Sequence, residues 1–337
     1  MVNIYTALDI SVERLNEIVK NLKQGNIKAW ECVYFSYGRG LDSFDVVDII
    51  SLIDELSLNH GTDGIWSSLE IISMYQYDRE ELERQLATKI EQLICSKELL
   101  GEKRATYRDS FLFEQLILLV QKHYGISDRF AVELSNQIVR LCQSDYSQTF
   151  SAFDRDCRNI IKLLVKEKPS LLWDVVSRFF ETATSLENYN LKTLIRYPTD
   201  TFDGKSHNKA GTLFGVPEAD IKEWARVNPE VRAPFLCIFY PVLDTTSDDI
   251  NWHPSLEKLT YDFGSVKEFR EALENRLSPN SWSGSIVPHL EIYLQPLQKW
   301  FNHSVPEMSH WSKDVYRSLE KRIEREKGRR QKKSTFF

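Results

Sequence analysis

The sequence predicts an all-α protein, and three observations carry that prediction. All eleven prolines lie at or after Pro169, so the first 168 residues lack the residue that most strongly interrupts helix interiors. Apolar residues recur in that half at the three- and four-residue spacing of amphipathic helices. Alternation of apolar and polar residues, which is typical of strands, is nearly absent.

Each helix of the first half is predicted from an apolar stripe and the residues that bound it. The first stripe runs from Leu8 to Leu22, and Gly25 ends it because glycine readily adopts the left-handed conformation after a helix. Asp42 or Ser43 can cap one later helix, and Ser127-Asp128 can cap another. The remaining stripes predict helices over 27–37, 44–56, 65–74, 82–93, 111–124, 130–141, 150–164, 170–180 and 191–195.

The spacing of these helices predicts how they pack. Starts near 8, 43, 78, 127 and 169 suggest antiparallel pairs of roughly 35–45 residues, the size of HEAT-like repeats. We therefore expect an irregular HEAT-like α-solenoid of stacked antiparallel helix pairs. Because no consensus letters repeat, an irregular helical domain without stacking is the alternative.

Composition changes near residue 200 and divides the chain into three parts. Residues 1–200 are the predicted helical-repeat region, and residues 201–326 form a helical C-terminal region rich in proline and tryptophan. Two of its helices are expected after Val216-Pro217-Glu218 and Asn228-Pro229-Glu230, where proline occupies a helix start. Residues 327–337 are expected to be a basic, flexible tail.

The last predicted helix joins a packing surface to a basic run. Ser304 and Glu307 have the spacing of a capping box, and apolar residues follow from Met308 to Ile323. From Lys321 to the end there are eight basic and two acidic residues, in a chain whose net charge is −6. Candidate phosphate contacts are therefore confined to this end of the chain. They are Lys327, Arg329, Arg330, Lys332 and Lys333. The alternative is that this basic run is only a solubilising terminus.

Several classes of protein are disfavoured. The sequence has neither an apolar run near the roughly 20 residues that span a bilayer nor a basic-then-apolar leader, so we expect a cytoplasmic protein without a membrane partner. The five cysteines are scattered, which indicates reduced, buried thiols. No phosphate-binding loop, zinc spacing or nucleophile elbow is present, so we expect no enzyme, metal or cofactor.

A resemblance rests on four stretches of the last third. Pro229 to Pro234, Phe263-Gly264, Trp282 to Ser285 and the helix from Val305 to Glu326 resemble the helical C-terminal region of some large bacterial proteins. In that family HEAT-like repeats follow an ATPase or effector domain, and several members act in antiviral defence. The resemblance covers residues 197–327 and implies a C-terminal piece or a separate subunit. No catalytic residue carries over, because none of the family's catalytic motifs is present.

Three functional hypotheses follow. The first is a non-enzymatic scaffold or sensor that binds another protein, an effector or ATPase subunit, with Trp252 and Trp282 as candidate interface residues. The second is an accessory protein that binds nucleic acid through the basic tail. The third is an enzyme with a dispersed site near Asp248 and His253, where acids, an aromatic ring and an imidazole are close in sequence.

Overall fold

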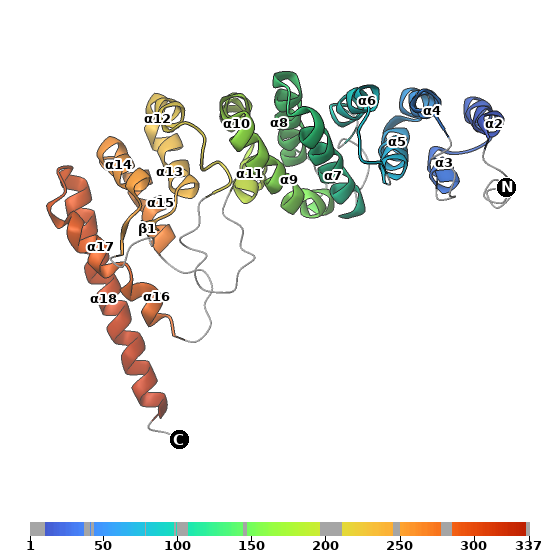
Figure 1. Ribbon diagram of the computed structural model, residues 1–337. Coiled ribbons are helices and arrows are strands. Elements are labelled where there is room, and N and C mark those ends of the chain that lie inside the picture. The colour runs from blue at the N-terminus through green and yellow to red at the C-terminus, as the bar shows by residue number, and fades with distance from the viewer. Residues whose placement is uncertain are drawn as a thin grey trace. The chain divides into compact units, whose positions relative to one another are not determined.

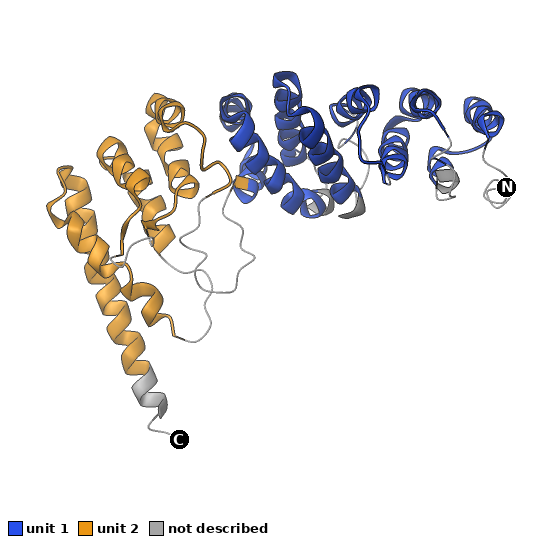
Figure 2. Cartoon of the chain, viewed as in Figure 1, with its two compact units in different colours: residues 1–194 blue, residues 195–337 orange. Residues whose placement is uncertain are grey.

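The computed structural model describes residues 11–36, 41, 44–77, 79–97, 99, 107–143, 147–195, 211–244, 250–277 and 285–334. Within these ranges the protein is all-α, as predicted, apart from the short antiparallel pair β1 (Leu243–Asp244) and β2 (Asn251–Trp252). The chain divides into two compact units, Met1–Leu194 and Ile195–Phe337 (Figure 2). This division lies close to the composition change near residue 200.

The helices of unit 1 follow the predicted stripes (Figure 1). They are α2 (Val12–Lys23), α3 (Ala29–Ser36), α4 (Val46–Asn59), α5 (Gly61–Gln76), α6 (Arg84–Ile94), α7 (Tyr107–Tyr124), α8 (Asp128–Gln143), α9 (Ser147–Glu167), α10 (Pro169–Thr182) and α11 (Ser185–Ile195).

Local chemistry explains several of these boundaries. The Ser11 hydroxyl accepts a hydrogen bond from the Arg14 N–H at 3.3 Å, which satisfies a backbone donor at the start of α2. Gly25 has a φ of +69°, as expected for the glycine that ends this helix. The predicted cap before α8 is also present, since the Ser127 hydroxyl accepts from the Phe130 N–H at 3.2 Å.

Helices near one another in sequence make the main contacts of unit 1: α4 packs on α5, α3 on α5, α7 on α9, and α8 on α10. Their shared core is mostly aliphatic, with Phe153 in edge contact with Phe113 at 5.8 Å. Buried polar side chains tie helices together. The Gln137 amide of α8 donates to the carbonyls of Ile94 and Ser96, at 2.8 and 2.6 Å.

A second polar contact joins α7 to α9. The Ser110 hydroxyl donates to the buried Asp156 carboxylate at 2.6 Å, and the Arg155 Nε donates to the same group at 2.9 Å. Glu114 lies beside them and accepts from the Asn159 amide at 2.9 Å. Burial raises the pKa of Glu114, the Asn159 hydrogen bond lowers it, and the nearby Asp156 charge raises it further.

Unit 2 contains several short helices, one long helix and the β1–β2 pair (Figure 1). They are α12 (Glu218–Val227), α13 (Pro229–Phe239), α14 (Pro254–Phe263), α15 (Lys267–Leu277), α16 (Val287–Glu291), α17 (Leu294–Lys299), the 3₁₀ turn η3 (Trp300–Asn302) and α18 (Pro306–Ser334). Pro229, Pro254 and Pro306 each occupy a first helical position, where a missing N–H breaks no helical hydrogen bond.

The core of unit 2 is rich in aromatic rings. Trp252 and Trp300 stack with centroids 3.9 Å apart, and Trp311 of α18 lies 6.3 Å from Trp300. Gly264 lies against α18 so closely that a Cβ there would meet the Met308 side chain at 2.3 Å and the Thr260 carbonyl at 2.2 Å.

The start of α18 differs from the predicted capping box. The helix begins at Pro306, and the Val305 N–H donates to Nδ1 of His303 at 3.1 Å, so an imidazole binds this backbone donor. His303 Nε2 lies 2.9 Å from the Thr260 hydroxyl, which itself donates to the Glu257 carbonyl. These contacts require a neutral ring with its proton on Nε2.

The end of α18 also differs from the prediction. Residues 327–334, the first part of the expected flexible tail, continue helix α18, which ends at Ser334. Lys, Arg and Gln are good helix formers, and Arg329 pairs with Glu326 three residues earlier in the same helix, so these residues favour its extension.

Candidate functional site

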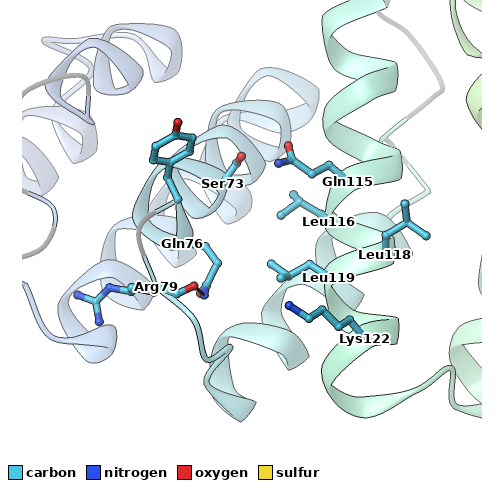
Figure 3. A pocket seen from close by; sticks show the side chains of 9 residues that line it. Ser73, Gln76, Arg79, Gln115, Leu116, Leu118, Leu119 and Lys122 are labelled. Carbon is cyan, nitrogen blue, oxygen red and sulfur yellow. Dashed lines mark hydrogen bonds between the residues drawn. The ribbon is translucent and has the colours of Figure 1, made fainter.

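The described structure contains a groove between α5 and α7 in unit 1 (Figure 3). It has a cavity volume of about 410 Å³, toward the lower end of the roughly 300–1,000 Å³ of ligand pockets. Helix α5 and the turn after it contribute one wall, and α7 contributes the other. The lining residues are Ser73, Gln76, Tyr77, Arg79, Gln115, Leu116, Leu118, Leu119 and Lys122.

The apolar part of the groove arises from the sequence of α7. Its middle, Phe111 to Val120, is apolar around most of the helix, so packing one face on the core leaves apolar side chains on another. Leu116 is buried, whereas Leu118 is 44% and Phe111 57% exposed. Figure 3 shows Leu118 directed away from the groove side that holds Leu119, so the apolar surface continues over the helix.

The turn after α5 is held by a glutamine. The buried Gln76 amide donates to the carbonyls of Arg79 and Glu81, at 3.0 and 2.9 Å, and so closes the chain into this turn. Tyr77, which also lines the groove, is 83% exposed. The α5 wall is therefore fixed at its base and presents an accessible aromatic ring.

The two cations of the groove are placed differently. The Arg79 guanidinium lies 3.9 Å from the centre of the Tyr75 ring, and Figure 3 shows it directed away from α7. Lys122 is exposed, and its amine is directed into the groove in the same view. The described lining residues include no carboxylate, so the charged side chains among them are both cations.

The lining groups are of several chemical kinds. The described lining offers two hydroxyls, from Ser73 and Tyr77, together with two amides, two cations and an apolar floor, and it includes no histidine, cysteine or carboxylate. Sequence reasoning did not identify this groove. The signal was the excess of apolar residues in α7, which was interpreted only as evidence for a helix.

Trp252 does not lie on an accessible surface. It is 3% exposed, stacks on Trp300, and its indole N–H donates to the Pro296 carbonyl at 2.8 Å. Trp252 was predicted to be an interface residue. Its burial argues against that prediction, because both ring faces and the polar edge are covered by unit 2 itself. Trp282, the other candidate, lies outside the described residues.

The basic residues at the end of α18 are partly paired. Lys327 forms an ion pair with Glu291 of α16 at 2.8 Å, and Arg329 forms one with Glu326 at 2.8 Å. Exposed pairs of this kind contribute little to stability. The side chains of Arg330, Lys332 and Lys333 lie outside those the structure describes.

His253 makes a hydrogen bond at the start of α14. His253 Nδ1 accepts from the Ser255 N–H at 3.3 Å at the start of α14, and its ring meets Phe214 edge-on. Burial lowers the pKa of His253, and the nearby Asp244 raises it. Asp248, proposed as its partner in a dispersed active site, lies outside the described residues, and the described residues contain no metal-binding cluster.

The five thiols are free, as expected; all are buried except the partly exposed Cys95. Burial raises the pKa of Cys32, Cys95 and Cys237 to about 12. Burial also raises the pKa of Cys142 and Cys157. Such thiols stay protonated at neutral pH and are poor nucleophiles.

No helix in the described part of the chain combines the length and apolar character needed to cross a bilayer. Comparison of the chain with protein-family models, with curated proteins and with solved structures finds no match.

Proposed function

We propose that this protein is a non-enzymatic interaction module that binds another protein through the groove between α5 and α7. The observation that carries the proposal is the apolar surface of this groove and of the adjoining α7 face, where Leu118 and Phe111 are accessible. Exposed apolar groups beside a polar rim are typical of protein-interaction sites.

We further propose that the helices form an irregular HEAT-like stack. Support comes from unit 1, where the main contacts join helices that are neighbours or next neighbours in sequence. Stacked repeats contact only adjacent repeats and display one face of each pair to a partner. The resemblance of residues 197–327 adds a partner class, an effector or ATPase subunit of a bacterial defence system.

A site-specific crosslink tests the binding proposal. A photoreactive residue at Leu118 should give a discrete crosslinked product in the native host, and the same residue at Leu186, exposed on α11, should not. The product is identified by mass spectrometry and the complex rebuilt from purified components. Equal crosslinking at both positions, or none at Leu118, would contradict this site.

Nucleic-acid binding through α18 is a second candidate, favoured by the cluster of basic residues carried on a helix that continues to Ser334. Deleting residues 327–337 should weaken binding of a labelled DNA or RNA oligonucleotide. It should also reduce the slope of log affinity against log salt by about 0.9 per lost phosphate contact on duplex DNA. An unchanged affinity and slope would rule out this end of the chain as the contact.

A further inference from the structure

We propose that the partner presents an acidic, amphipathic helix, which lies along α7 with its apolar stripe on Phe111 and Leu118 and a carboxylate at Lys122. This inference rests on the proposed function and names the chemistry of the segment that the groove accepts. It is argued from the backbone of the groove walls, the spacing along α7 and the charge of the lining.

The walls favour a helical occupant over an extended one. Both are α-helices, whose interior N–H and C=O groups are already bonded within α5 and α7. An extended peptide buried on Leu116 and Leu119 would find no backbone partners there, and each unpaired buried group costs free energy. A helix satisfies its own backbone and needs only side-chain contacts from the groove.

The spacing along α7 sets the length of the contact. Phe111, Gln115, Leu118 and Lys122 follow one another by three or four residues and therefore share one face of the helix. This face spans roughly 16 Å at 1.5 Å per residue, about three turns. A partner helix of about three turns would cover it, with apolar side chains at i, i+3 or i+4, and i+7.

The charge of the groove lining indicates the charge of the partner segment. Residues 1–194 carry 29 acidic and 22 basic side chains, yet the described lining of the groove has two cations and no carboxylate. Arg79 is held against the Tyr75 ring, so Lys122 is the cation directed toward an occupant. Electrostatic complementarity therefore favours a partner with Asp or Glu near the end of its stripe that meets Lys122.

The exposed ring of Tyr77 fits the same occupant. It follows α5 and belongs to the groove lining, so a helix lying on α7 would bring apolar side chains near it. An aromatic ring with a polar tip can cover such side chains while its hydroxyl stays in water. The groove then contacts a partner helix from both α5 and α7.

The test is a selection from a displayed peptide library against the full-length protein. The library keeps a leucine stripe at helical spacing over 14 positions and randomises the flanking positions among acidic, basic, neutral and proline residues. Enriched peptides are remade with a fluorescent label, and their affinities are measured by anisotropy. We expect acidic, proline-free sequences that become helical on binding.

Two variants and two matched controls locate the contact. Leu118→Asp should weaken the selected peptides about tenfold or more, since it places a charge in the apolar contact. Lys122→Glu should weaken acidic peptides about two- to fivefold, the range of a partly exposed ion pair, and should favour peptides with Lys at the same position. Leu186→Asp and Lys162→Glu change exposed residues elsewhere in unit 1 and should leave the affinity unchanged.

The outcomes separate the inference from the proposed function. If selected peptides lose affinity with Leu118→Asp but are basic, indifferent to charge or interrupted by proline, the acidic helix is wrong and the groove remains the binding site. If no peptide is enriched, or if Leu118→Asp leaves the affinity unchanged, both are overturned. Circular dichroism of each variant verifies that the loss does not come from unfolding.

Discussion

The two units stabilise their helices by different chemistry. Unit 1 uses an aliphatic core and buried polar ties such as Gln137 to the end of α6. Unit 2 uses stacked indoles and proline-started helices, two of which have a backbone N–H near the start bound by a neutral histidine, His253 or His303. The comparison teaches that an apolar helix face adjoins the groove in unit 1, whereas the two histidines whose pKa is lowered by burial lie at helix starts of unit 2.

Removing an indole should have the largest effect and should be confined to unit 2. Trp300→Ala removes a ring that is 2% exposed and is expected to cost about 3–5 kcal/mol of unfolding free energy. Hydrogen exchange followed by mass spectrometry should show lost protection in α17 and α18. An equal loss across α4 and α5 would show that the units unfold together.

A close backbone approach gives the next largest effect. Gly264→Ala places a Cβ against Met308 and the Thr260 carbonyl, and the forced shift should cost about 2–3 kcal/mol. Gly328→Ala is the matched control within the same unit, because nothing lies within 4 Å of its Cβ. It should be neutral or stabilise α18 by up to about 1 kcal/mol. Urea unfolding of both variants provides the measurement, and similar costs for both would contradict the packing described at Gly264.

Acid should act on the two units in opposite directions. Burial lowers the pKa of His253 and His303 below 6.5, although Asp244 and Glu257 oppose it. The stability contributed by the neutral rings is present above pH 6.5 and lost as pH falls through the folded pKa values. Glu114 of unit 1 has a raised pKa, so its contribution is present below 4.5 and lost as pH rises through the folded value.

Two measurements at pH 7 and at pH 5.5 compare the pH dependence of the two units. Urea unfolding gives the overall stability, and hydrogen exchange, corrected for intrinsic rates, locates the change in the chain. Peptides at the start of α18 should lose more protection at pH 5.5 than peptides of α7. His303→Gln removes the titrating group, so it should flatten the pH dependence at the start of α18. A pH dependence that survives this substitution would assign the effect to another group.

The smallest effect is expected at the ion pair between α18 and α16. Lys327→Ala removes an exposed partner of Glu291 and should cost less than about 1 kcal/mol, declining further with added salt. Thermal unfolding at low and high salt gives this value. A cost of several kcal/mol would mean that the end of α18 is held far more firmly than an exposed pair allows.

The sequence predicted most helices because periodicity, glycine and capping residues act locally. Gly25 and Ser127 lie where their chemistry predicted. Helices α14 and α15 were not predicted individually, since their stripes are short and rich in charge. The start of α18 was assigned to Ser304, but His303 binds the Val305 N–H instead, held there by Thr260 from another helix.

The candidate site was not predicted, for a related reason. A tryptophan has the same letter whether it stacks inside a core, as Trp252 does, or faces a partner. The groove depends on which side of α7 the core leaves uncovered, and that is decided by the placement of α5 and α9 around it. Only tertiary packing distinguishes the buried Leu116 from the exposed Leu118, two residues later.

The length of α18 has a mechanical consequence. Its 29 residues span about 43 Å, and its first turn is positioned by the imidazole contact before Pro306. A tilt of about 10° at that end would displace the other end by about 7 Å, simply from the length of the helix. The contacts that resist such a tilt are therefore spread along the helix, which packs on α16, α17 and η3 and buries Leu319 and Ile323.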